Sequence, residues 1–236
     1  MVPSSHDALR GIPLNKALDT SSLLSRSIEA LAANAPVFLG IALVVQSPQL
    51  VLVALGRGAF GAAQEEASFL AILGMLLPLL ALTQVQAGLV APGVARSLGG
   101  ETVRLRHCLP PTGGAFLAIL LAALMVALAA AGGFLFFLLP GWVVLTGFFV
   151  ALPAVAIEGR PPVAALGLSW QLTSRNWISL FALVFMFTVL ERLLSIALTV
   201  GLGAPPLVPA LVAVPISALQ AVTAAVAYLR LRGEEA

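Results

Sequence analysis

The residues that could perform acid–base or metal chemistry are few, and they lie outside the apolar stretches. The two histidines, His6 and His107, fall in polar segments, as do Asp7 and Asp19. An intramembrane serine protease would need a histidine within its spans, and an intramembrane aspartyl protease would need two aspartates there. The single Cys108 excludes an intramolecular disulfide, and neither an H-E-x-x-H motif nor a phosphate-binding glycine loop occurs. The sequence therefore predicts a non-enzymatic protein without a catalytic residue set, metal site or cofactor.

Two ionisable residues, Glu191 and Arg192, do enter an apolar stretch. A charge at the centre of a bilayer costs about 2.5 to 3.5 kcal/mol on insertion scales, so such residues are candidates for a functional site. Neighbouring side chains on a helix point in different directions, and we therefore expect that the two do not neutralise each other as a local pair. They either form a polar site for an ion, a headgroup or a partner helix, or lie at the outer boundary of a long helix. Gln84 and Gln86 are the next intramembrane polar group, for which hydrogen bonding between helices is the simpler role.

The elements that carry these residues are membrane spans. The chain has 236 residues, of which 60% are hydrophobic and 9% are charged, whereas soluble domains are about 25% charged. Residues 116–139 contain no charged residue, and about 20 apolar residues suffice to cross a bilayer. The net charge of +2 is too small to indicate a nucleic-acid partner. We predict an all-α, polytopic transmembrane helix bundle.

Six spans are expected, at residues 36–56, 67–90, 115–138, 142–157, 177–200 and 206–229. They form a membrane domain over residues 21–232, between a flexible cytoplasmic tail at 1–20 and a C-terminal tail at 233–236. An amphipathic helix over 23–34, capped by Ser21 or Ser22, precedes the first span. Pro48 is expected to kink or end that span, and Pro140 with Gly141 to break the chain before the fourth.

The basic residues fall on alternate connections. With a cytoplasmic N-terminus, ten of the twelve lie inside, and Arg57 lies outside. The inside residues are Arg10, Lys16, Arg26, Arg96, Arg104, Arg106, Arg160, Arg175, Arg230 and Arg232. This asymmetry follows the positive-inside rule and predicts a multi-pass protein of the bacterial inner membrane with both termini in the cytoplasm.

The connector between the fourth and fifth spans is the most distinctive segment. A span ends at Glu158, Gly159 turns the chain, and a short interfacial helix is expected before residue 177. Glu158 is expected to pair with Arg160, Arg175 or an arginine of another inside loop. The remaining connector residues of interest are Ala165, Leu166, Ser169, Trp170, Thr173 and Asn176.

This connector resembles that of the glycerophosphoryl diester phosphodiesterase membrane domain family, bacterial six-span proteins. The matching pairs are Ala165-Leu166, Ser169-Trp170, Leu172-Thr173 and Asn176-Trp177, and residues 225–232 resemble the closing Tyr-x-x-Leu-Arg element of the family. In family members with enzymatic activity, a separate soluble barrel carries it. A chain of 236 residues is too short to contain that barrel in addition to the spans. The resemblance therefore implies a membrane module without the phosphodiesterase.

Two functions are compatible with these patterns. The first is a non-enzymatic membrane protein acting through contacts with membrane lipids, or with another membrane or cytosolic protein. Its inner face would carry Arg96, Arg104, Arg106, Arg160 and Arg175, each adding about 1 kcal/mol with anionic lipid, unless these arginines serve only to set the topology. The second is a transporter or channel for a lipidic or small polar solute. It would place Gln84, Gln86, Glu191 and Arg192 around one central cavity.

Overall fold

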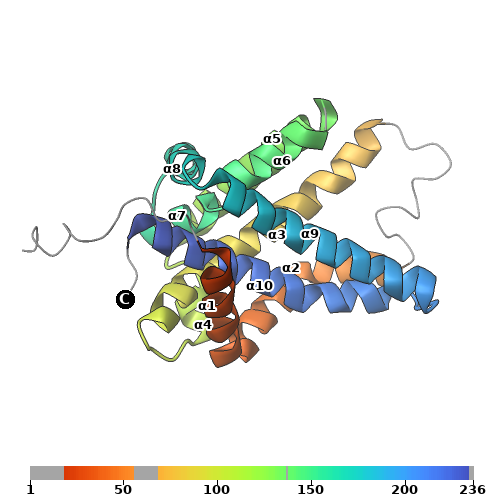
Figure 1. The fold of residues 1–236 in the computed structure, drawn as a ribbon, viewed down its shortest axis with the longest axis horizontal. Helices are drawn as coiled ribbons and strands as arrows, with labels where there is room; N and C mark the ends of the chain where they lie inside the picture. Colours follow the sequence, from red (N-terminus) through yellow and green to blue (C-terminus); the bar gives the residue numbers. More distant parts are fainter. Residues whose placement is uncertain (1–18, 56–68, 137, 234–236) are drawn as a thin grey trace, which may run out of the picture.

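The computed structural model describes residues 19–55, 69–136 and 138–233, which form a bundle of helices and contain no strand (Figure 1). The expected flexible tails, apart from Asp19, Thr20 and Gly233, fall outside the described residues, as do Arg10, Lys16 and Arg57. The helices are α1 (Thr20–Ala33), α2 (Ala35–Ala54), α3 (Phe69–Leu98), α4 (Leu105–Cys108), α5 (Gly113–Phe136), α6 (Leu138–Gly147), α7 (Ala151–Glu158), α8 (Pro162–Ser174), α9 (Trp177–Ile196) and α10 (Leu207–Arg232). A π-helical turn, Ala197–Gly201, continues α9.

Within the described residues, five helical segments are long and apolar enough to cross a membrane. They are Ala35–Ala54, Gly113–Leu135, Leu139–Glu158, Trp177–Gly201 and Leu207–Arg232. α3 occupies the place of the remaining expected span. Its 30 residues correspond to about 45 Å at 1.5 Å per residue. The all-α architecture of a membrane protein is confirmed, with boundaries that differ from those expected by a few residues at most of the ends.

Two local expectations were wrong, and of the two outcomes expected at Pro48, a kink or the end of the span, the end does not occur. Asp19, rather than Ser21 or Ser22, caps α1, and its carboxylate accepts hydrogen bonds from the backbone N–H and the hydroxyl of Ser21. Pro48 lies inside α2, which continues for six residues beyond it. Pro140 and Gly141 lie inside α6, where a proline near the start of a helix gives up an N–H that has no helical partner anyway. The real interruption of the fourth span is at residues 148–150, between α6 and α7.

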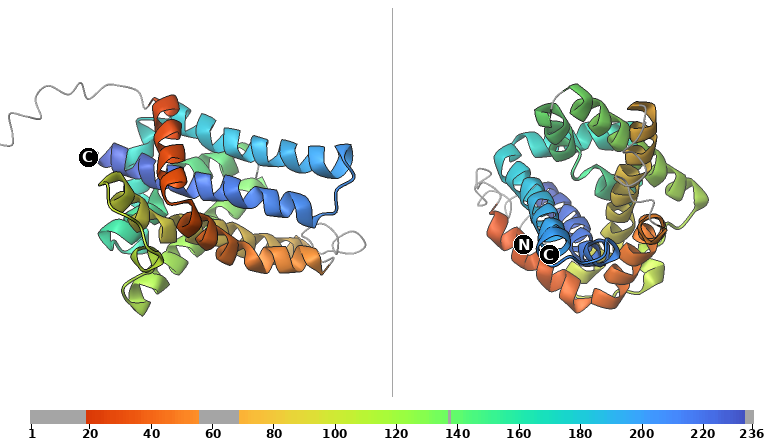
Figure 2. Two further views of the ribbon diagram at one scale, coloured as in Figure 1. Left: turned by 90° about the horizontal axis from the view of Figure 1, so that it is seen from below. Right: turned by 90° about the vertical axis from the view of Figure 1, so that its right-hand side faces the viewer.

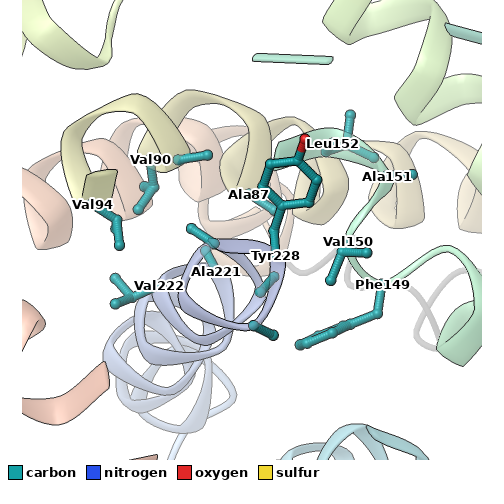
Figure 3. Packing of buried hydrophobic residues seen from close by; sticks show 14 of the residues in the cluster. Ala87, Val90, Val94, Phe149, Val150, Ala151, Leu152, Ala221, Val222 and Tyr228 are labelled. Atoms are coloured by element: carbon teal, nitrogen blue, oxygen red, sulfur yellow. The ribbon is translucent and has the colours of Figure 1, made fainter. Parts of the chain in front are cut away.

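The core is built around the second half of α10. Residues 221–229 of this helix are all buried, and they pack mainly against α3, with α1, α2 and α9 completing the surroundings. Figure 3 shows the ring of Tyr228, which is fully buried, close to Ala87 and Val90 of α3 and to residues 149–152. Small side chains on these helices let their backbones approach closely, which is how helices associate in lipid.

One end of the bundle collects the short helices. α1 runs across the bundle there and packs on α10, while α4, α7 and the C-terminal end of α10 lie close by (Figure 2). α8, which Figure 1 views nearly along its axis, packs on α7. We call this the arginine-rich end, because the described arginines other than Arg192 lie on these elements or on the neighbouring end of α3.

The α3–α4 connection is fixed at this end by polar and apolar contacts. The side-chain amide of Asn34 donates to Ser97 Oγ (2.8 Å), and its oxygen accepts from the backbone N–H of Val103 (3.1 Å). Cys108 is 1% exposed, and a Cβ atom added to Gly93 would lie 2.5 Å from its Sγ atom. α4 therefore packs tightly onto a glycine of α3.

We expect Cys108 to resist alkylation in the folded protein. Burial raises the pKa of its thiol to about 11, so only about one molecule in a thousand carries the reactive thiolate at pH 8. Maleimide labelling followed by mass spectrometry, in mild detergent and in denaturant, checks this. Labelling that is equally fast in both conditions would show that Cys108 is accessible.

Candidate functional site

The side chain of Glu158 joins three elements at the arginine-rich end. Its carboxylate accepts hydrogen bonds from the hydroxyl of Tyr228 and from the guanidinium of Arg160, and it lies 2.8 Å from Nε of Arg232. The side chain of Glu158 is only 17% exposed. The expected pairing with Arg160 is confirmed, and α10 supplies the other two partners. The carboxylate thus ties the end of α7 to the last turns of α10.

The local sequence places Glu158 at this junction. Gly159 ends α7 in the left-handed conformation, with a φ of 65°, and its N–H bonds to the carbonyl of Val155 (3.0 Å). Glycine adopts this conformation without steric cost. Pro161 and Pro162 then start α8, so the chain turns within three residues and Arg160 stays beside Glu158.

α8 supplies the polar groups that the break between α6 and α7 requires. The N–H of Ala151 bonds to Phe148 instead of Gly147, which leaves the carbonyl of Gly147 without its helical donor. The hydroxyl of Ser169 donates to this carbonyl (2.8 Å). The hydroxyl of Thr173 lies 3.2 Å from the same carbonyl and 2.9 Å from the carbonyl of Ser169, so its single proton can serve either acceptor. Both side chains are buried. The hydroxyl of Ser169 therefore replaces the missing backbone hydrogen bond, and the hydroxyl of Thr173 is within reach of the same carbonyl.

The other connector residues support the same contact. A Cβ atom on Gly147 would lie 2.4 Å from the ring of Trp170, so this ring packs directly on the glycine. Ala165 and Leu166 of the same helix are buried. Asn176 precedes α9, and its backbone carbonyl accepts a hydrogen bond from the N–H of Leu180. The connector helix is thus docked on the bundle through its small and polar face.

The predicted intramembrane polar residues lie in two separate places. Gln86 is fully buried, and its amide donates to Ser217 Oγ of α10 (3.3 Å), which also accepts from Gln46 of α2. Gln84 lines a neighbouring cavity of about 40 Å³, together with Phe149, Ser217 and Gln220. Neither Glu191 nor Arg192 lines this cavity. This cavity therefore does not gather all four residues, because the two charges lie on α9, which packs on α6 and α10.

Glu191 and Arg192 do form a pair, contrary to expectation. Arg192 Nη2 lies 3.6 Å from Glu191 Oε1, and the two side chains are 62% and 29% exposed, respectively. The long arginine side chain bends back along the helix surface, so the angle between adjacent side chains does not keep the charged ends apart. The pair sits in the second half of α9, beside the exposed Leu190 and Leu193.

The arginines of the predicted headgroup face divide into two groups. Arg96 pairs with Glu101 (3.4 Å) and Arg160 with Glu158. Arg104, Arg106 and Arg175 are exposed and form no ion pair within the described part of the chain. Burial, together with Arg96 and Arg106, lowers the pKa of His107, which lies between these arginines. The surface around α4 therefore has a positive potential.

Sequence reasoning missed Tyr228 and Arg232 as partners of Glu158, and it missed the carbonyl of Gly147. The pairing of Glu158 with residues of the sixth span could have been found. Spans four and six end on the same side of the membrane, and the residues of the family resemblance lie near both ends. No family model, curated protein or solved structure matches this chain. The assignment of the site thus depends on its geometry alone.

We expect Glu158→Ala to destabilise the protein by about 2 kcal/mol, chiefly because it leaves the buried hydroxyl of Tyr228 without its acceptor. Glu158→Gln should cost less, since an amide still accepts from Tyr228. Thermal unfolding in detergent measures both changes. Glu101→Ala is the matched control, because its pair with Arg96 is exposed and should contribute less than about 1 kcal/mol. Equal losses for the variants at Glu158 and Glu101 would contradict the role of Glu158.

Ser169→Ala and Thr173→Ala should each have a small effect, while the double variant should cost about 2 kcal/mol. Either hydroxyl satisfies the carbonyl of Gly147, and only their joint removal leaves a buried acceptor unpaired. Unfolding of the two single variants and the double variant tests this. Thr188→Ala is the control, since its hydroxyl bonds only within α9. Strictly additive losses would disprove the shared acceptor.

Proposed function

We propose that this protein is a non-enzymatic integral membrane protein that binds anionic lipid headgroups through its arginine-rich end. The observation that carries the proposal is the set of exposed arginines, Arg104, Arg106 and Arg175, for which the described chain provides no carboxylate partner. Arg104 precedes α4, Arg106 lies within it, and Arg175 follows the last residue of α8. Under the positive-inside rule this end faces the cytoplasm, and the membrane is the bacterial inner membrane.

The connector geometry supports a membrane module of the kind that the sequence resembles. The two stretches similar to the glycerophosphoryl diester phosphodiesterase membrane domain family meet at Glu158 and Tyr228. Under this proposal the chain is the module without a catalytic barrel, and its partners are lipids or another protein. The cavity beside Gln84, which a transporter using this residue would need, has a volume of about 40 Å³, enough for only a few water molecules.

The double variant Arg104→Ala/Arg106→Ala should lower the preference for phosphatidylglycerol over phosphatidylcholine by up to about thirtyfold. This corresponds to about 1 kcal/mol for each charge near the surface. Native mass spectrometry of protein extracted from mixed vesicles measures the lipids retained. The matched variant Arg104→Lys/Arg106→Lys keeps the charge and should keep the preference. An unchanged preference in the alanine variant would mean that these arginines only set the topology.

A further inference from the structure

A cleft of about 350 Å³ opens at the arginine-rich end, between α1 and the last turns of α3 and α10. Its volume lies within the range of small-molecule sites, about 300 to 1,000 Å³. Arg26 and Glu29 line it from α1, Ser97 from α3 and Arg230 from α10, and Val226 and Leu229 form its apolar part. The cleft thus combines charges of both signs with an apolar wall.

The walls of the cleft are held in place by hydrogen bonds within the protein. The guanidinium of Arg230 donates to Ser22 Oγ (2.8 Å) and to the Ser22 carbonyl (3.1 Å), which fixes α1 to α10. Ser97 accepts from Asn34, which also binds the N–H of Val103. A ligand would therefore meet side chains on elements that are already positioned, which lowers the entropy cost of binding.

The charge pattern discriminates between headgroups. Arg26 and Glu29 are three residues apart on one helix and so lie on the same face of α1, with Arg230 on the helix that α1 packs against. A purely anionic headgroup would meet the carboxylate of Glu29 as well as the two arginines. A zwitterionic headgroup places its phosphate on the guanidinium groups and its ammonium on the carboxylate.

We propose that this cleft binds the phosphoethanolamine headgroup of a membrane phospholipid. The phosphate lies between Arg26 and Arg230, and the primary ammonium donates hydrogen bonds to Glu29. A choline headgroup carries the same charges, but its nitrogen has no N–H to donate. The inference rests on the proposed lipid-binding function and adds a site for a second headgroup class.

The full chain, reconstituted in vesicles of phosphatidylethanolamine, phosphatidylcholine and phosphatidylglycerol, provides the test. After detergent extraction, native mass spectrometry should show phosphatidylethanolamine retained several-fold over phosphatidylcholine. Glu29→Gln should reduce this ratio to about one. Glu101→Gln is the matched control, because Glu101 pairs with Arg96 outside the cleft. Ala33→Phe, which fills the cleft without changing its charge, should also remove the preference.

Soluble competitors separate the sources of the phosphate. Phosphoethanolamine should displace the retained lipid at concentrations where inorganic phosphate does not, and equal displacement by both would overturn the contact with Glu29. Equal retention of ethanolamine and choline lipids by the unmodified protein, or an unchanged ratio in Glu29→Gln, would also overturn the proposal. If the unmodified protein retains phosphatidylethanolamine but shows no preference for phosphatidylglycerol over phosphatidylcholine, the proposed function of Arg104 and Arg106 is overturned. The proposal for the cleft would then still stand.

Discussion

A half-buried carboxylate at the end of a span needs hydrogen-bond donors on its protein side, and the structure around Glu158 follows from that constraint. An unpaired charge in an apolar surrounding is costly, whereas one with several donors is tolerated. Tyr228, Arg160 and Arg232 supply the donors, and two of the three come from the last turns of α10. The fourth and sixth spans are therefore joined at the same end of the bundle, where α8 begins and α1 packs on α10.

The same rule governs the break between α6 and α7. A helix interrupted inside an apolar bundle leaves a carbonyl group that water does not reach, and the chain must provide a donor from another element. α8 does so through Ser169 and Thr173, on the face that also buries Ala165 and Leu166. The serine and threonine of the connector are thus explained by backbone chemistry. Trp170, which packs on Gly147, explains why that position has no side chain.

The spans were predictable because a bilayer imposes length and apolarity on each segment separately. The effects of individual prolines on the helices were less predictable. Pro48 lacks only one N–H, and continuing α2 past it exposes fewer backbone groups to lipid than ending the helix would. The pairs across the bundle were not predictable, since hydropathy does not say which faces meet. Tyr228 with Glu158 depends on how α10 packs, and so does Ser217 with Gln86. The separation of Gln84 from Glu191 follows from the same packing.

The arginines at one end of this molecule show how one residue type serves two purposes. Arg160 and Arg232 meet the carboxylate of Glu158, and Arg230 meets Ser22, so their guanidinium groups hold elements together. Arg104 and Arg106 lie on the short α4 connection, are exposed, and raise the local potential enough to contribute to the lowered pKa of His107. A positive charge needed only for topology could lie anywhere in the connection. Here the two arginines lie on or next to a turn that is held by Asn34 and by the packing of Cys108 on Gly93, which gives the proposed headgroup contacts a fixed geometry.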